Sequence, residues 1–163
     1  MSFNKVKINF GCGNNPLIGY VNYDKFPIDE RVKYIDLNNL PLLFPNNSVD
    51  EILLSHVLEH LTDPYGVVLE CYRILKPGGV LRVNLPSTLR ASLPHLRTGF
   101  GPSYFYCLTR KYTGSESNNF FNVSVSFGTR YRGFEYLYMR WQNFRDWFLR
   151  QFFDEYRYKL VKK

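Results

Sequence analysis

Short apolar runs separated by turn residues make up the first half of the chain, and five of them have the length and composition of buried strands. One longer segment, residues 63–75, repeats apolar side chains at helical spacing. It opens with Asp63 and Pro64, an N-cap residue and a proline suited to the first helical position, and the Lys-Pro-Gly-Gly of residues 76–79 predicts its end. The predicted strands are Val6–Phe10, Tyr20–Tyr23, Val32–Ile35, Glu51–Leu54 and Val80–Leu85.

Strands that alternate with a helical segment predict an α/β fold with a mainly parallel, covered sheet. The second half has a weaker pattern. Residues 86–119 are rich in proline and glycine and predict a loop, whereas an aromatic stripe predicts a helix over residues 142–153. Tyr156–Leu160 alternates apolar and basic residues, which is typical of an exposed-edge strand.

Charge and aromatic residues are unevenly distributed between the two halves. The formal net charge is +7. Residues 1–87 hold eight Lys and Arg against nine Asp and Glu, whereas residues 88–163 hold 13 against five, with 20 of the 29 aromatic residues. A basic surface favours anionic partners, so the halves are expected to have different roles within one domain.

The cysteines indicate a reducing compartment. Cys12, Cys71 and Cys107 are odd in number and far apart, which argues against a disulfide framework or a cysteine zinc site. The polar start, Met1–Lys7, does not have the pattern of a signal peptide. No apolar run approaches the roughly 20 residues that span a bilayer. We therefore expect a soluble, cytoplasmic protein without a membrane span.

A glycine-rich turn follows the first predicted strand. Gly11-Cys12-Gly13 provides a backbone that can turn tightly and let a ligand approach, at the strand end where open α/β sheets bind nucleotides. Asp24, at the end of the second strand, could accept hydrogen bonds from two ribose hydroxyls. Asp36 and Leu37, after the third strand, could contact an adenine. An ordinary turn or helix cap is the alternative for each carboxylate.

Five strings of the first half carry a resemblance to a known family: Asn9–Pro16, Gly19–Asp24, Leu40–Pro45, Asp50–Leu61 and Ile74–Leu81. In this order and spacing they resemble the class I S-adenosylmethionine-dependent methyltransferases, and most closely the small type 11 group that includes quinone-biosynthesis enzymes. The resemblance covers about residues 5–87. It implies a Rossmann-like class I methyltransferase fold, with residues 1–87 binding S-adenosylmethionine and residues 88–163 forming a basic, aromatic-rich substrate or oligomer half.

The resemblance also implies residue roles. Gly11, Cys12 and Gly13 would border the methionine part of the cofactor. Asp24 would hold the ribose, and Asp36 and Leu37 would flank the adenine. Ser55 and His56 would lie near the transferred methyl group, with His56 a candidate general base because its ordinary pKa of about 6.5 suits that work.

One departure from the family concerns the connection after the first strand. Ten residues separate Gly13 from Asp24, too few for a full helix and a strand. The sequence therefore predicts a truncated or missing first crossover helix. A helix N-terminus would otherwise help to bind the cofactor.

His56-Val57-Leu58-Glu59-His60 matches the H-x-x-E-H pattern of a group of zinc proteases. On a helix, His56 and His60 would share one face and could bind zinc, with Glu59 as base. The segment follows a predicted strand, however, so a zinc hydrolase is a minor alternative, as is a metal that assists transfer to a hydroxyl. We expect no metal site, with Glu59 and His60 satisfying local hydrogen bonds.

The methyl acceptor is left open by the sequence. Basic and aromatic residues interleave over 130–145, which suits a nucleic acid held by phosphate contacts and base stacking. The alternative is that these aromatics form a core or a homodimer surface. A methyltransferase fold without catalysis, kept as a nucleic-acid- or partner-binding module, is the second class of function.

Overall fold

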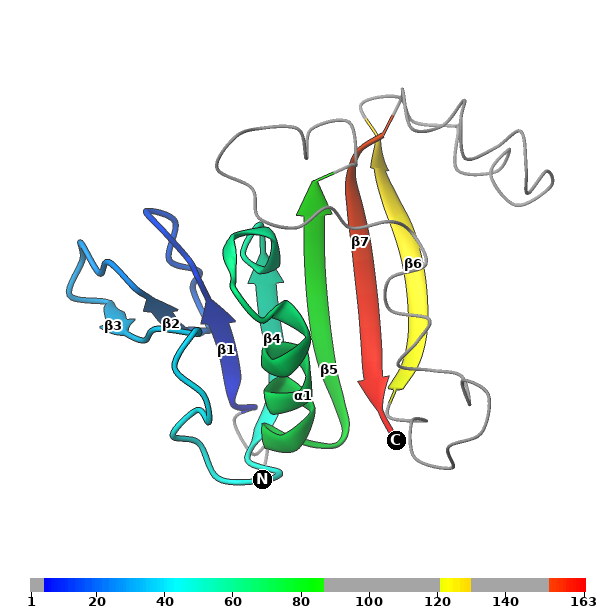
Figure 1. Cartoon of the computed structure of the whole chain (residues 1–163), viewed down its shortest axis with the longest axis horizontal. Coiled ribbons are helices and arrows are strands. Elements are labelled where there is room, and N and C mark those ends of the chain that lie inside the picture. Colours follow the sequence, from blue (N-terminus) through cyan, green and yellow to red (C-terminus); the bar gives the residue numbers. More distant parts are fainter. Residues whose placement is uncertain (1–4, 87–120, 130–152) are drawn as a thin grey trace, which may run out of the picture.

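The computed structural model describes residues 5–86, 121–129 and 153–163, and the structural statements below concern these residues. They form a seven-stranded sheet in the order β3-β2-β1-β4-β5-β7-β6 (Figure 1). The chain order reverses between β1 and β4, where open α/β sheets bind ligands at the carboxyl ends of their strands. The strands are β1 (Lys7–Phe10), β2 (Val21–Asp24), β3 (Val32–Tyr34), β4 (Val49–Ser55), β5 (Leu75–Pro86), β6 (Phe121–Thr129) and β7 (Phe153–Lys162).

The first five strands are parallel, and β7 runs antiparallel to both β5 and β6. The predicted mainly parallel α/β sheet is therefore confirmed. β5 is longer than predicted: Leu75 already pairs with Val49, and an irregularity in the register precedes the pairing of Val80 with Glu51. The Lys-Pro-Gly-Gly segment, which was predicted to end the helix, does follow α1 but lies within this irregular part of the strand.

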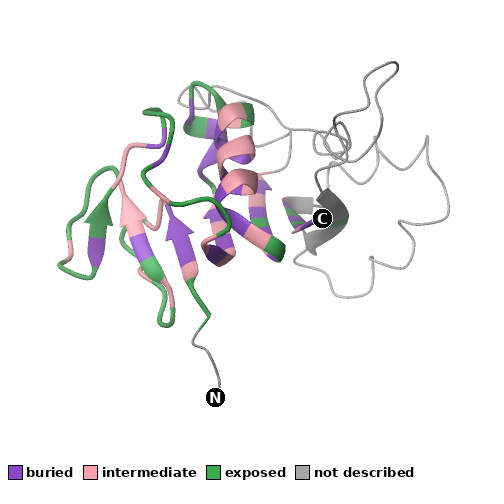
Figure 2. Cartoon of the chain, turned by 90° about the horizontal axis from the view of Figure 1, so that it is seen from below, coloured by how far each residue is buried: buried purple, intermediate pink, exposed green. Residues whose placement is uncertain are grey.

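The helix α1 (Pro64–Ile74) packs on one face of the sheet (Figure 2). Its predicted N-cap is confirmed, since the Asp63 carboxylate accepts a hydrogen bond from Gly66 N at 2.8 Å. The buried face of α1 consists of Val67, Val68, Cys71 and Ile74. It covers the apolar positions of the central strands, where Ile52, Leu54, Leu81, Val83 and Leu85 are fully buried.

The opposite face of the sheet is polar across β5 and β7. Arg82 pairs with Lys159 and Asn84 with Arg157, so these side chains lie side by side on one face. Arg82, Arg157 and Lys159 are exposed. No helix among the described residues lies on this face, which explains why these strands alternate apolar and polar residues instead of being apolar throughout.

The predicted truncation of the first crossover is confirmed, because residues 11–20 contain no helix. Two buried amides hold this connection. Asn9 Nδ2 donates to Asn22 Oδ1 at 3.0 Å. The Asn22 side chain also accepts from Leu17 N at 2.9 Å and donates to Leu17 O and Tyr20 O. Side-chain amides therefore satisfy backbone groups that a helix would have paired internally.

The last strands differ from the sequence prediction. β7 is an interior strand between β5 and β6, and Tyr156, Tyr158 and Leu160 are buried. The exposed-edge prediction was wrong because alternation of apolar and basic residues also fits an interior strand with one open face. β6 was not predicted. The predicted loop over 86–119 and helix over 142–153 lie outside the described residues except at one end each, where Pro86 ends β5 and Phe153 begins β7.

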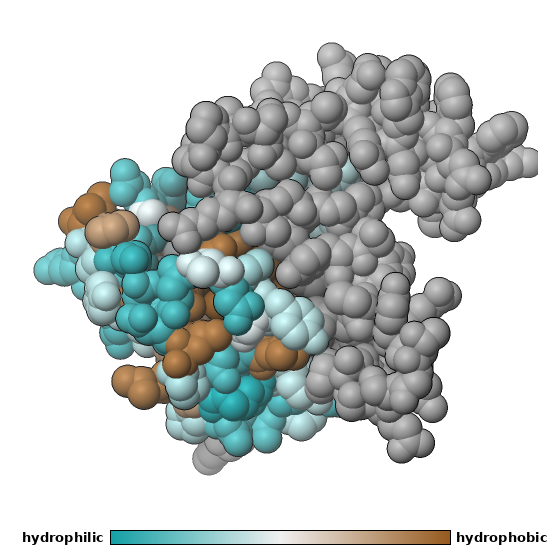
Figure 3. Space-filling model, viewed as in Figure 1, coloured by the Kyte–Doolittle hydropathy of each residue, from teal (hydrophilic) through white to brown (hydrophobic). Residues whose placement is uncertain are grey.

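Exposed hydrophobic side chains are scattered over the described surface. Ile18 and Leu43 are almost fully exposed, as Phe26 and Ile28 are in large part. Figure 3 shows such groups separated by hydrophilic side chains on the face that carries α1. Isolated apolar side chains of this kind are normal for a soluble surface.

Candidate cofactor pocket

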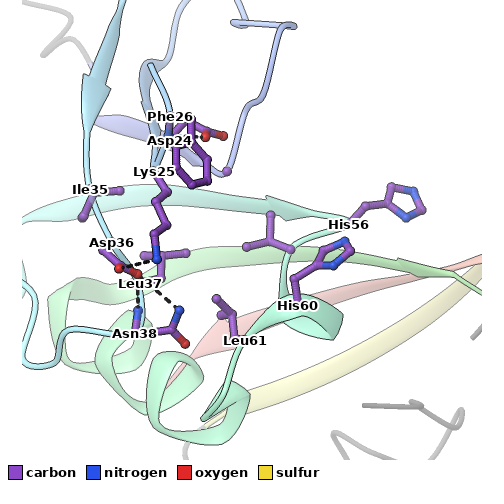
Figure 4. Close-up of a pocket in the computed structure, with 12 residues that line it drawn as sticks. Asp24, Lys25, Phe26, Ile35, Asp36, Leu37, Asn38, His56, His60 and Leu61 are labelled. Atoms are coloured by element: carbon purple, nitrogen blue, oxygen red, sulfur yellow. Dashed lines mark hydrogen bonds and ion pairs between the residues drawn. The ribbon is translucent and has the colours of Figure 1, made fainter. Parts of the chain in front are cut away.

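A pocket of about 380 Å³ opens at the carboxyl ends of β1, β2 and β4 and at the segment after β3. Asp36 and Asn38 lie toward one end of it, and His56 and His60 toward the other (Figure 4). The lining residues are Gly11, Asp24, Lys25, Phe26, Ile35, Asp36, Leu37, Asn38, His56, Val57, His60 and Leu61.

The glycine turn after β1 forms one wall of the pocket. Gly11 N and Cys12 N both donate to Tyr23 O, at 2.8 and 3.2 Å, which holds the turn against β2. Gly11 has a φ of +67°, and a Cβ there would collide with the Val57 side chain. Glycine is therefore required at this position both for the backbone conformation and for the close approach.

Asp24 ends β2 at the pocket and orders the loops on either side. Its Oδ2 accepts from Gly13 N at 2.8 Å, and its Oδ1 accepts from Phe26 N at 2.9 Å. Each carboxylate oxygen has a second lone pair, so the group can accept further hydrogen bonds from a ligand.

Asp36 lies in the segment after β3 and is held on two sides. Lys25 Nζ lies 2.8 Å from its Oδ2, and Asn38 N donates to its Oδ1 at 3.0 Å. The Lys25 ammonium, followed by the Asn38 N–H, lowers the pKa of Asp36. The carboxylate is consequently ionised at neutral pH and can accept hydrogen bonds.

Five of the eight predicted site residues line this one pocket: Gly11, Asp24, Asp36, Leu37 and His56. Gly13 and Cys12 do not line it, although Gly13 reaches Asp24 through its backbone. Ser55 also lies outside the lining, and its hydroxyl accepts from Asn84 Nδ2 on β5 at 3.2 Å.

Seven lining residues were missed: Lys25, Phe26, Ile35, Asn38, Val57, His60 and Leu61. A signal for most of them was present, since five lie within two positions of a predicted residue at the end of a strand: Lys25, Phe26, Ile35, Asn38 and Val57. Their side-chain directions, however, depend on the folded loops.

His56 follows β4 and adopts a left-handed backbone conformation, with a φ of 56°. Its Nε2 lies 3.5 Å from Glu155 Oε2 on β7, and its Nδ1 lies 3.5 Å from Glu59 Oε1. The carboxylate of Glu155, then that of Glu59, raises the pKa of His56 to about 9. His56 therefore holds its proton at neutral pH, and the ordinary pKa assumed for a general base does not apply.

The H-x-x-E-H segment does not present its histidines on an α-helix. Residues Leu58–His60 form a single 3-10 turn, and the buried Glu59 faces His56 instead of acting beside a metal. No group of three or more potential metal ligands occurs within residues 5–86, 121–129 and 153–163. The geometry gives the zinc hydrolase no support.

The strand order and the pocket at the β1–β4 reversal define a Rossmann-like class I methyltransferase fold. A methyltransferase from Archaeoglobus fulgidus, described as dependent on S-adenosylmethionine, superposes with a TM-score of 0.65 at 14% identity, covering 97% of this chain and 86% of that one. A family model described as "Methyltransferase domain" matches residues 20–83.

Proteins with similar sequences are also described as methyltransferases. A probable S-adenosylmethionine-dependent methyltransferase of Mycolicibacterium smegmatis is 41% identical over 61 residues, which are 37% of this chain and 23% of that protein. An uncharacterized methyltransferase of Mycobacteroides abscessus is 31% identical over 113 residues, 63% of this chain and 43% of that protein. Together the family model, these relatives and the fold support a class I S-adenosylmethionine-dependent methyltransferase. The chain spans less than half the length of these two relatives.

No helix of the described residues has the length and apolar character needed to cross a membrane.

Proposed function

We propose that this chain binds S-adenosylmethionine in the pocket and transfers its methyl group to an acceptor. The observation that carries the proposal is the convergence of Gly11, Asp24 and Asp36 on one cavity at the β1–β4 reversal. The three residues come from three separate strand ends, as a nucleoside-binding site of this fold requires.

The pocket residues fit the cofactor from one end to the other. Asp24 would accept hydrogen bonds from the ribose hydroxyls while its other lone pairs keep the two loops ordered. Asp36 and the buried Leu37 would flank the adenine, and Gly11 would leave room for the methionine part. Ser55 would act only indirectly, through the end of β4.

The cofactor supplies an activated methyl group, so the protein mainly has to position the acceptor in line with it and exclude water. His56 would border the methyl group as a protonated, hydrogen-bond-donating side chain. Because its pKa is about 9, it would accept a proton from an acceptor only at high pH.

The acceptor, a homodimer and a cytoplasmic location remain predictions. The interleaved basic and aromatic residues of 130–145 support a nucleic-acid acceptor, but they lie outside the described residues. If that acceptor is correct, its binding should weaken steeply with salt.

Calorimetric titration with S-adenosylmethionine and S-adenosylhomocysteine tests the proposal. The wild type should bind both, and Asp24→Asn should weaken both at least about tenfold, the loss expected for a hydrogen bond to a charged group. Asp29→Asn is the matched control, because Asp29 follows the same strand but pairs with Arg31 outside the pocket.

Failure of the wild type to bind either compound would refute the proposal. If the same protein then bound nucleic acid, the non-catalytic module would be the better description. Transfer of labelled methyl from the donor into an extract component would complete the case for an enzyme.

A further inference from the structure

Arg82 on β5 and Lys159 on β7 are direct partners in the sheet register, so two cations lie side by side on the polar face of the sheet. Both residues are exposed, and 46% of the Arg82 side chain is accessible to solvent. Like charges directly opposite one another destabilise a pair of strands. Such a cost to stability is typical of residues that serve binding instead of folding.

Both cations keep hydrogen-bond donors that the described residues do not use. Arg82 donates from Nε to Glu51 Oε1 at 2.8 Å, and no described residue accepts from its two terminal nitrogens. No described residue pairs with the Lys159 ammonium. The terminal N–H groups of a guanidinium and those of an ammonium therefore lie together on an open face, where an external acceptor can reach them.

The surroundings of this pair are positive. Where the register of β1, β4, β5 and β7 is regular, the same face carries four basic side chains and two carboxylates: Lys7, Arg82, Arg157 and Lys159, with Glu51 and Glu155. Both carboxylates already pair with basic residues of this face. Residues 87–120 and 130–152 contain nine Lys and Arg and three Asp and Glu, so they bring no net negative charge. The charge that balances the pair is therefore expected from a partner.

The cationic face leads to one end of the cofactor pocket. Glu155, Arg157 and Lys159 occupy alternate positions of β7, so their side chains lie on one face of the sheet. Glu155 Oε2 lies 3.5 Å from Nε2 of His56, which lines the pocket. A ligand that runs along β7 from Lys159 would therefore reach the His56 end of the pocket.

An extended polyanion fits this surface better than a small anion does. The exposed face of a sheet does not enclose a small ligand, whereas a chain of phosphates gains a contact at each cation that it passes. Asn84, two positions from Arg82 on the same face, carries an amide of the kind that contacts phosphate and sugar oxygens. The net charge of +7 on the chain favours the same class of partner.

We infer that the face of β5 and β7 around Arg82 and Lys159 binds the sugar–phosphate backbone of a nucleic acid, with both side chains donating to phosphate oxygens. This surface is separate from residues 130–145, for which the sequence alone predicts nucleic-acid contacts. The inference does not rest on the proposed function, because neither cation lines the cofactor pocket.

The test is fluorescence anisotropy of a labelled single-stranded oligonucleotide of mixed sequence, titrated with the full chain at several salt concentrations. Lys159→Gln removes one cation of the pair and keeps a polar side chain. Lys33→Gln is the matched control, because Lys33 is also an exposed lysine in a strand but lies on β3, at the far edge of the sheet. Thermal melting confirms that each variant is folded.

Each phosphate contact contributes about 0.7 to the slope of log K against log salt for a single strand. Lys159→Gln should therefore reduce this slope by about 0.7 and weaken binding about fivefold at about 0.1 M salt, if the electrostatic contribution vanishes near about 1 M. Arg82→Gln combined with Lys159→Gln should lose about twice the slope and about 25-fold in affinity. Lys33→Gln should change neither quantity.

Lys159→Glu separates binding from a structural role. This substitution places a carboxylate opposite Arg82, and opposite charges across a pair of strands stabilise it. Lys159→Glu should therefore raise the melting temperature while it weakens oligonucleotide binding more than Lys159→Gln does. A residue that served only the fold would not show these opposite effects.

Failure of the wild type to bind the oligonucleotide, or equal effects of Lys159→Gln and Lys33→Gln on binding, would overturn the inference. Polyglutamate and phosphatidylglycerol vesicles, added at equal charge, should not displace the oligonucleotide. Displacement by either would overturn it in favour of an acidic protein or a membrane surface. The proposed function is tested separately by the titration with S-adenosylmethionine, so the two can fail independently.

Discussion

Gly13 N donates to Asp24 Oδ2 over 2.8 Å, which ties the glycine turn after β1 to the end of β2. The other oxygen of the same carboxylate accepts from Phe26 N. Asp24 therefore orders two loops of the pocket before any ligand is bound. Loss of this side chain would disturb both the contact and the loops, which is why the amide variant, with one oxygen left, is the informative substitution.

Alanine substitutions at Gly11 and Gly13 should separate backbone strain from steric collision. Both glycines have positive φ, which costs an alanine about 1–2 kcal/mol. A Cβ at Gly13 meets nothing within 4 Å, whereas one at Gly11 meets Val57. Gly13→Ala should lower the free energy of unfolding in urea by about 1–2 kcal/mol, and Gly11→Ala should lower it further. Equal losses would contradict this account of Gly11.

Asn22→Leu should loosen the connection that replaces the first crossover helix. The substitution leaves the buried Asn9 Nδ2 without its partner, and a buried unpaired group costs about 1–3 kcal/mol. It also removes the side-chain partner of the part-buried Leu17 N, Leu17 O and Tyr20 O. We expect a loss of at least about 2 kcal/mol in urea unfolding and faster amide exchange at Leu17. Asn14→Leu, at an exposed position of the same connection, should change little. Comparable losses in the two variants would argue against the amide network.

His56 should make stability depend on pH between about 6.5 and 9. Its pKa in the folded protein is raised to about 9 by Glu155 and Glu59, above the unfolded value of 6.5. The stabilisation is therefore fully present below pH 6.5 and is lost as the pH rises through 9. Urea unfolding at several pH values measures the loss of stability, and an NMR titration of the imidazole measures the pKa of His56.

Glu155→Gln is the matched variant for that prediction, because it keeps the shape of the side chain and removes the larger cause of the shift. The pKa of His56 should fall toward its ordinary value, and the loss of stability with rising pH should shrink. A wild-type imidazole that titrates near 6.5 would show that the two carboxylates do not hold the proton.

Lys162→Met should destabilise the end of the sheet. The buried Lys162 Nζ donates to Asn47 Oδ1, Tyr72 O and Leu75 O at 2.7–2.8 Å and lies over the Tyr72 ring. These bonds join β7 to the end of α1, so losing them should cost about 1–3 kcal/mol in thermal or urea unfolding. Lys159→Met, at an exposed position of the same strand, should have little effect. Equal stability of Lys162→Met and wild type would contradict the anchoring role.

Local signals were sufficient for much of the first half of the fold. Strands such as Val6–Phe10 and Glu51–Leu54 are short apolar runs bounded by turns, and Asp63-Pro64 begins α1 as its sequence predicts. The candidate site was partly predictable because some of its residues also have a local signal in the sequence. Gly11, Asp24 and Asp36 each follow a strand, and the carboxyl ends of parallel strands meet at one edge of a sheet.

Distant contacts could not be predicted in this way. Glu155 reaches His56 from the last strand, and this contact changes the charge of the histidine. Lys25 has no sequence feature that indicates Asp36 as its partner. Alternation in Tyr156–Leu160 indicated a strand with two different faces but could not show whether another strand lay beside it.

The sequence by itself determined the approximate positions of the first five strands and of the helix, that the first crossover lacks a helix, and which carboxylates follow strand ends, because these depend on residues that are neighbours in the chain. Only the tertiary structure decided that β7 lies inside the sheet, that His56 is charged, and that Lys25 forms an ion pair with Asp36. Those properties depend on the pairing of segments far apart in the chain, and pairing is set by the packing of the whole sheet.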